Sequence, residues 1–138
     1  MRHVINVSTG EKTIEPDAPI IPLTLSQTKE EKFSEIAKAR SNAETAPVLI
    51  QGNPFPATEE FQAKVSRALN YLGRGKPLNL TNAWRDSNAQ PVTMNAVLLG
   101  QIEDAITAQG VAAWTRYWSL FDAVNAATTV ETVNSIVW

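Results

Sequence analysis

The clearest alternation of apolar and polar residues is helical, and it fills the second half of the chain. Thr58 is a good N-cap, and the stripe that follows it, which ends at Gly73, predicts a helix over 58–72. Similar spacing predicts helices over 95–109, with Gly110 as its C-cap, over 111–127, and over 129–137, with Thr128 and Glu131 as a capping box. The third of these helices has the fullest stripe, so we expect it to organise the core: Val111, Trp114, Trp118, Phe121 and Val124.

An earlier helix is expected over 25–46, ahead of Pro47. Its capping box is either Thr24 with Gln27 or Thr28 with Glu31. The apolar stripe is narrow and lies beside a charged face, so this helix should be only partly buried.

Three segments read as strands or hairpins. Residues 48–50 form a short apolar strand that a turn over 51–54 closes before Phe55. Residues 76–93 resemble a hairpin, with Trp84 before the turn residues 85–88. The first 14 residues predict a hairpin with Gly10 in its turn, and the prolines at 16, 19 and 22 then hold the chain extended in a polyproline-like arm.

These elements predict an α+β fold: a small helical domain with two short β-hairpins, preceded by an extended N-terminal hairpin and a proline-rich arm. The expected divisions are a docking arm over 1–23, a helix and linker over 24–47, and a C-terminal α+β domain over 48–138. A chain of 138 residues has room for one core.

Composition removes most catalytic chemistry from consideration. The chain has no Cys and one His, His3, so disulfides, thiol chemistry and zinc sites built from these residues are excluded. The acidic residues occur as sequence neighbours, such as Glu59 with Glu60 and Glu103 with Asp104, which point in different directions on a helix. We therefore expect no enzyme, no catalytic residue, no cofactor and no metal.

Charge and the length of apolar runs argue against two classes of partner. Acidic residues interrupt the densest positive zone, in which Tyr71 and Trp84 also lie, and the net charge of the chain is −2, so we expect no nucleic acid as a partner. The basic residues of this zone are Lys64, Arg67, Arg74, Lys76 and Arg85. No apolar run approaches 18 residues, so no membrane insertion is expected.

Two aromatic positions leave alternatives open. Trp84 and Arg85 could form an exposed recognition site on a hairpin tip, although a buried Trp84 is the favoured interpretation. The terminal Trp138 could close the core or lie in a subunit interface, and we favour the core because Ile136 and Val137 adjoin it.

The order of these features resembles a known family. The chain is similar to small phage tail-fibre-associated proteins that carry a C-terminal domain of unknown function. The similarity rests on these segments, in this order: the N-terminal strand 1–7 with Thr9-Gly10-Glu11, Phe55-Pro56-Ala57, the helix 61–69, the Trp84 segment through Pro91-Val92 and the ending 126–133. The resemblance covers residues 50–138 well and the first 23 more loosely, and none of its motifs is catalytic.

The resemblance implies a structural protein of a phage tail fibre or baseplate that docks onto a partner tail protein through its N-terminal arm. Strand addition is the expected mode, with these interface residues: Val4, Ile5, Val7, Ile14, Ile20, Ile21 and Leu23. The resemblance also implies a location in the virion tail, in the host cytoplasm before assembly, and several copies per virion, with a trimer among the expected states. The alternatives are a tail-fibre assembly chaperone that leaves the particle or, less favoured, a glycan-binding receptor module.

Overall fold

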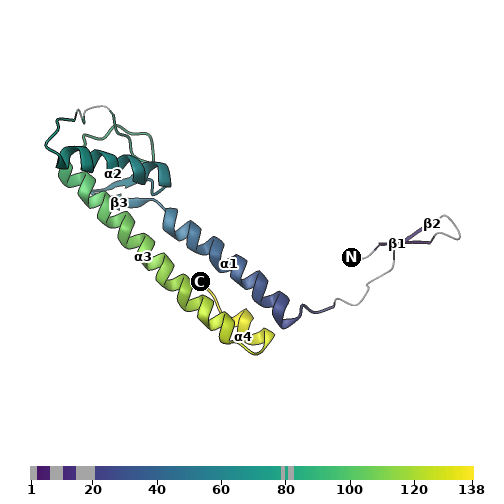
Figure 1. The fold of residues 1–138 in the computed structure, drawn as a ribbon. Coiled ribbons are helices and arrows are strands. Elements are labelled where there is room, and N and C mark those ends of the chain that lie inside the picture. The colour runs from purple at the N-terminus through teal and green to yellow at the C-terminus, as the bar shows by residue number, and fades with distance from the viewer. Residues whose placement is uncertain (1–2, 7–10, 15–20, 79, 81–82) are drawn as a thin grey trace.

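The computed structural model describes residues 3–6, 11–14, 21–78, 80 and 83–138 (Figure 1). They form a mostly helical domain with a two-stranded antiparallel sheet, and a second hairpin lies near the N-terminus. The elements in chain order are β1 (His3–Asn6), β2 (Glu11–Ile14), α1 (Leu25–Thr45), β3 (Val48–Ile50), β4 (Asn53–Phe55), α2 (Glu59–Gly73), α3 (Ala96–Ala126) and α4 (Val130–Ser135).

Helices α1 and α3 run antiparallel and form the long axis of the domain (Figure 1). Helix α1 begins with the expected capping box: the Gln27 amide donates to Thr24 Oγ1 at 3.1 Å, and the Thr24 amide donates to Gln27 Oε1 at 2.9 Å. It ends where Ala46 becomes extended, as a residue before Pro47 prefers. The segment 24–47, expected as a helix and linker, thus packs along α3 within the domain.

Helix α2 and the β3–β4 hairpin pack at the N-terminal half of α3. Val48 pairs with Phe55, and both side chains are buried in the main core. The turn residues Gln51 and Gly52 have φ values of 52° and 82°, the left-handed conformation that fits the twist of a two-residue hairpin. The main core joins these two strands to α2 and α3: Val48, Phe55, Ala57, Val65, Ala68, Trp84, Met94, Leu98, Leu99, Ile102 and Ile106.

A smaller cluster closes the opposite end of the domain. Val124, Ala127 and Val133 are buried there, with Leu25 and Phe33 of α1 packed against them. Helix α4 is capped by Thr129, whose Oγ1 accepts from the Thr132 amide at 3.2 Å. The expected cap at Thr128 is therefore wrong by one residue, and the helix ends at Ser135.

The expected break at Gly110 is also wrong, because α3 is one continuous helix of 31 residues. A glycine inside a helix costs about 1 kcal/mol relative to alanine, which packing can outweigh. The neighbouring Gln109 supplies part of that packing: its Nε2 donates to Ala46 O at 2.7 Å and to Glu44 O at 3.2 Å. It thereby satisfies carbonyl groups at the end of α1 that have no partner within that helix.

The segment expected as a second hairpin, 76–93, is a loop rather than a pair of strands. Among its described residues the strand-like pairing is a single bridge between Arg85 and Pro91. Next to this bridge the Val92 amide donates a hydrogen bond to Trp84 O at 3.0 Å. The turn itself is as expected. Proline at 91 has no amide to extend a ladder, which accounts for the short pairing.

Candidate protein-docking surface

The residues expected to contact a partner lie in and after the N-terminal hairpin. Val4 and Ile5 belong to β1 and Ile14 to β2, and the register pairs Val4 with Thr13 and His3 with Ile14. Val7 and Ile20 lie outside the described residues. Of the residues that lead into α1, Ile21 is 86% exposed and Leu23 is 43% exposed.

The exposed recognition site expected at Trp84 is not present, because Trp84 is only 3% exposed and belongs to the main core. Its ring packs edge-on against Phe61 with centroids 6.0 Å apart, and Lys64 Nζ lies 4.2 Å from its centroid. Arg85 is exposed, and its Nη1 donates to Ala89 O at 2.6 Å. The favoured interpretation, a buried Trp84, is confirmed.

Asp86 fixes the turn that follows. Its carboxylate is largely buried, and Oδ1 accepts from the Asn88 amide at 2.8 Å and from the Gln90 amide at 3.0 Å. The Ser87 amide also donates to Pro54 O at 2.8 Å, which ties the turn to β4. Asp86 therefore acts as a turn residue with backbone partners.

The basic residues of the sequence do not form one continuous patch. Lys64 and Arg67 of α2 line a shallow hollow with Tyr71, Leu78 and buried Trp84. Lys64 Nζ donates a hydrogen bond to Ala83 O at 3.0 Å. At the end of α2 the Arg74 guanidinium carbon lies 5.7 Å from the Tyr71 ring centroid.

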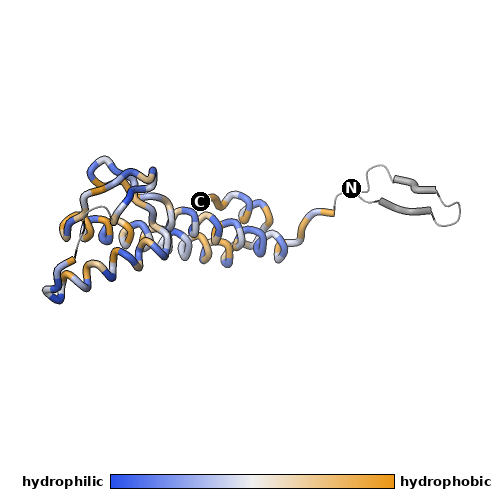
Figure 2. Tube along the Cα trace, turned by 90° about the horizontal axis from the view of Figure 1, so that it is seen from above, coloured by the Kyte–Doolittle hydropathy of each residue, from blue (hydrophilic) through white to orange (hydrophobic). Residues whose placement is uncertain are grey.

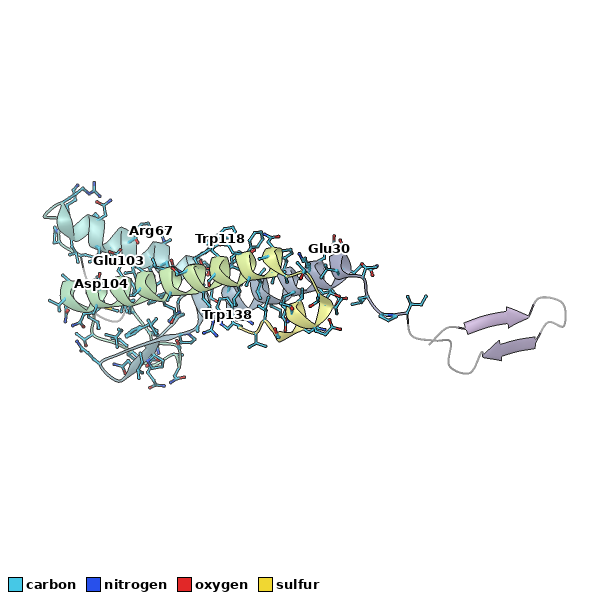
Figure 3. The ribbon with its side chains drawn as sticks, turned by 90° about the horizontal axis from the view of Figure 1, so that it is seen from below. Glu30, Arg67, Glu103, Asp104, Trp118 and Trp138 are labelled. Carbon is cyan, nitrogen blue, oxygen red and sulfur yellow. The ribbon has the colours of Figure 1, made fainter. Side chains whose placement is uncertain are left out.

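The neighbouring acidic residues Glu103 and Asp104 have different surroundings. Glu103 accepts a hydrogen bond from Ser66 Oγ at 3.2 Å, whereas Asp104 beside it is exposed (Figure 3). Within the described residues, no three His, Cys, Asp or Glu side chains are grouped closely enough to hold a metal ion. No helix among them has the length and apolar character needed to cross a membrane.

The surface that the sequence reasoning missed is aromatic. Trp114 and Trp118, expected in the core, are 37% and 50% exposed, and Val111 of the same stripe is 62% exposed. Val124 of the expected stripe is buried as predicted, but beside Val111 and Trp114 the buried residue of α3 is Ala113.

These aromatic rings contact one another along α3. The Trp114 and Trp118 centroids are 6.0 Å apart, and the Tyr117 centroid lies 5.0 Å from Trp118 in an edge-on arrangement. Phe121 continues the cluster, with its centroid 5.2 Å from Trp118 and 4.7 Å from Phe33 of α1. Packed rings hold each other in fixed orientations, so this is a preformed surface.

An arginine of α1 covers one edge of the cluster. The Arg40 guanidinium carbon lies 4.0 Å from the Trp114 centroid and 5.0 Å from that of Tyr117, at cation–π distance. Glu44 Oε2 is 3.7 Å from Arg40 Nε. The contact ties the aromatic surface to α1.

Beside the tryptophans lies an open hollow of about 450 Å³, which we call the aromatic groove. Gly110 forms part of its floor, and an added Cβ there would meet nothing within 4 Å. The groove is lined by Glu44, Gln62, Ile106, Thr107, Gly110, Val111, Trp114, Thr115 and Trp118.

Helix α2 closes one end of this groove. Gln62, in the first turn of α2, lines it, while Trp118 lies beyond the helix on the same side of α3 as Arg67 of α2 (Figure 3).

Trp138 lies on the other side of α3, half-buried, with the Arg116 guanidinium carbon 5.2 Å from its ring centroid (Figure 3). Trp138 therefore covers α3 at the surface instead of filling the core as expected.

The helical domain that carries this surface corresponds to a recognised sequence family. Residues 27–137 match the family described as a domain of unknown function, DUF4376. The chain belongs to the DUF4376 family. The searches of curated proteins and of solved structures find no match to the chain.

The extent of the DUF4376 match divides the molecule. It begins inside the first turn of α1 and includes α2, α3 and α4, so the aromatic groove lies wholly within the DUF4376 domain. The β1–β2 hairpin and the proline-rich segment precede it. The matched DUF4376 region thus excludes the N-terminal arm.

Proposed function

We propose that this protein is a structural component of a bacteriophage tail, associated with the tail fibre or baseplate, and that it docks onto a partner tail protein through its N-terminal arm. The phage context rests on the ordered sequence resemblance described above. One structural observation supports the docking mode: among the residues that the structure describes, β1 and β2 pair only with each other. In a sheet of two strands each strand has one edge without a paired neighbour.

Strand addition uses that edge. A two-stranded hairpin is marginally stable by itself in water, and a third strand supplied by a partner adds main-chain hydrogen bonds. We place Val4, Ile5, Val7 and Ile14 at this contact. Following the hairpin, Ile20, Ile21 and Leu23 supply apolar side chains for grooves of the partner, which fits the 86% exposure of Ile21 and the 43% exposure of Leu23.

The test is capture of tail proteins in coexpression. The full chain, a variant that lacks residues 2–20 but keeps the Thr24 cap, and the variants Ile5→Pro and Ile5→Val are each expressed with the tail-fibre and baseplate proteins of the same phage. Proline removes an amide that either closes the hairpin or faces the partner, whereas valine preserves the strand. We expect capture by the full chain and Ile5→Val only.

Circular dichroism of each variant checks that the helical domain is intact. Equal capture by the truncated variant would refute docking through the arm.

The alternative function is a tail-fibre assembly chaperone, which would use the same arm transiently. Mass spectrometry of purified virions separates the two. Peptides of this chain at a stoichiometric level support a permanent component, and their absence from infectious particles supports the chaperone.

A further inference from the structure

The aromatic groove lies along the part of α3 that α2 does not cover. Over its first half, α3 is covered by α2 on this side, and α2 begins at the level of Ile106 and Thr107. Beyond that level Val111, Trp114 and Trp118 face outward with 62%, 37% and 50% of their surface exposed. This concentration of apolar surface, in contact with a preformed hollow, is typical of an interaction site.

The area of the exposed stripe fits a short extended segment better than the surface of a second folded protein. Two half-exposed tryptophans and a valine offer on the order of 300 Å² of apolar surface. A stable interface between two folded proteins buries about 800 Å² on each partner. A peptide of about seven residues needs a surface of the smaller size.

The chain itself carries a segment whose chemistry matches aromatic rings. Pro16, Pro19 and Pro22 are spaced three apart, and a polyproline helix has three residues per turn, so its prolines would share one face at intervals of about 9 Å. Along α3, Val111 and Trp118 are seven residues apart, or about 10 Å. Proline-rich segments of this kind dock into aromatic-lined grooves with little loss of conformational entropy.

We propose that the aromatic groove binds the proline-rich segment 16–22 of a second copy of this chain. The described part of that segment leads away from the groove of its own copy: residues 21–24 precede the start of α1 and point away from the helices (Figures 1 and 2). Ile21 is 86% exposed in the single chain. The receptor that we propose is therefore the groove of a neighbouring copy, and the oligomeric state tests it against docking within one chain.

This contact joins two different surfaces, an arm at one end and a groove midway along α3. Such a head-to-tail contact closes into a ring if the rotation allows it and otherwise propagates. The inference goes beyond the proposed function, because it assigns the proline face of segment 16–22 to contact between copies and leaves β1, β2 and the side chains of Ile20, Ile21 and Leu23 for the tail partner.

A peptide titration tests the groove directly. The receptor is the full chain with Pro16, Pro19 and Pro22 replaced by alanine, so that its own arm cannot compete. The probe is a synthetic peptide of residues 13–24, which has no tryptophan, and binding is followed by calorimetry and by tryptophan fluorescence. We expect saturable binding, and at least tenfold weaker binding of the same peptide with alanine at its three proline positions.

Two glycines of α3 provide a matched pair of blocking variants. Gly110 lies in the floor of the groove and Gly100 lies outside it, and an added Cβ meets nothing within 4 Å at either position. Gly110→Met in the receptor should weaken peptide binding at least tenfold, whereas Gly100→Met should leave it unchanged. Trp118→Ala should also abolish binding, with circular dichroism as its control for folding.

Sedimentation velocity of the unmodified full chain tests the second copy. We expect association that rises with concentration, and its loss both in Gly110→Met and in the variant without the three prolines. Two results would overturn the proposal: no peptide binding, or peptide binding with an unmodified chain that stays monomeric at all concentrations. Neither outcome depends on Ile5→Pro, which tests capture of a tail protein.

Discussion

A partly buried amide helps to fasten the end of α1 to the middle of α3, and its removal gives a quantitative test of the fold. Gln109 Nε2 donates to Ala46 O at 2.7 Å and to Glu44 O at 3.2 Å, and these contacts are partly buried. Gln109→Met keeps the length of the side chain but removes the donor. The two carbonyl oxygens would then lose a partner that water replaces only in part.

The size of the effect follows from this geometry. One net hydrogen bond contributes about 1 kcal/mol, and leaving a partly buried carbonyl unsatisfied adds to that, so the free energy of unfolding should fall by about 1–2 kcal/mol. For a chain of this length the melting temperature should fall by about 3–6 °C. Urea denaturation followed by circular dichroism gives the first value and calorimetry the second.

Gln101 provides the control on the same helix. Its Oε1 accepts from Gln51 Nε2 at 2.9 Å, but both side chains are exposed. Gln101→Met should therefore change the free energy of unfolding by less than about 0.5 kcal/mol, because water replaces the lost bond. If the two variants were equally stable, the view that Gln109 fastens α1 to α3 would be refuted.

Three further changes test other parts of the domain. Asp86→Ala should lower the free energy of unfolding by about 2 kcal/mol, because the Asn88 and Gln90 amides lose their acceptor, while Asp86→Asn should recover most of it in urea denaturation. Phe55→Ala should cost about 3–5 kcal/mol by calorimetry, since this side chain has no exposed surface, and a loss below 1 kcal/mol would contradict its place in the core. Gly100→Ala should raise the melting temperature, because an added Cβ there meets no atom within 4 Å and alanine is the better helix former.

Local signals in the sequence were sufficient for most element boundaries. The Thr24 box, the Thr58 cap and the stop before Pro47 each depend on residues within one turn, and the structure has all three. The turn predicted over 51–54 is confirmed at 51–52, whereas Asn53 and Pro54 belong to β4. Such features are fixed by local backbone chemistry, so they are readable without knowledge of the packing.

The face that α3 buries was not readable in the same way. The helix carries two apolar stripes offset by one residue: a stripe of Ile106, Ala113 and Val124, which is buried, and the larger one of Val111, Trp114 and Trp118, which is exposed. Periodicity favours a helix for both stripes, and size favoured the aromatic one as the core. Close approach of α1 selects the small residue instead, because Ala113 fits between two antiparallel helices where a tryptophan does not.

The difference in helix length explains why that aromatic stripe remains uncovered. Helix α3 has 31 residues and is about 46 Å long, whereas α2 has 15 residues and is about 22 Å long. With its C-terminal end beside the start of α3, α2 reaches only the level of Thr107. The stretch from Val111 to Trp118 therefore stays open over about 10 Å, the length of two helical turns or of three extended residues. The groove therefore takes two of the three prolines of segment 16–22 at a time, because neighbouring prolines of that segment stand three residues apart and would turn one face toward the rings.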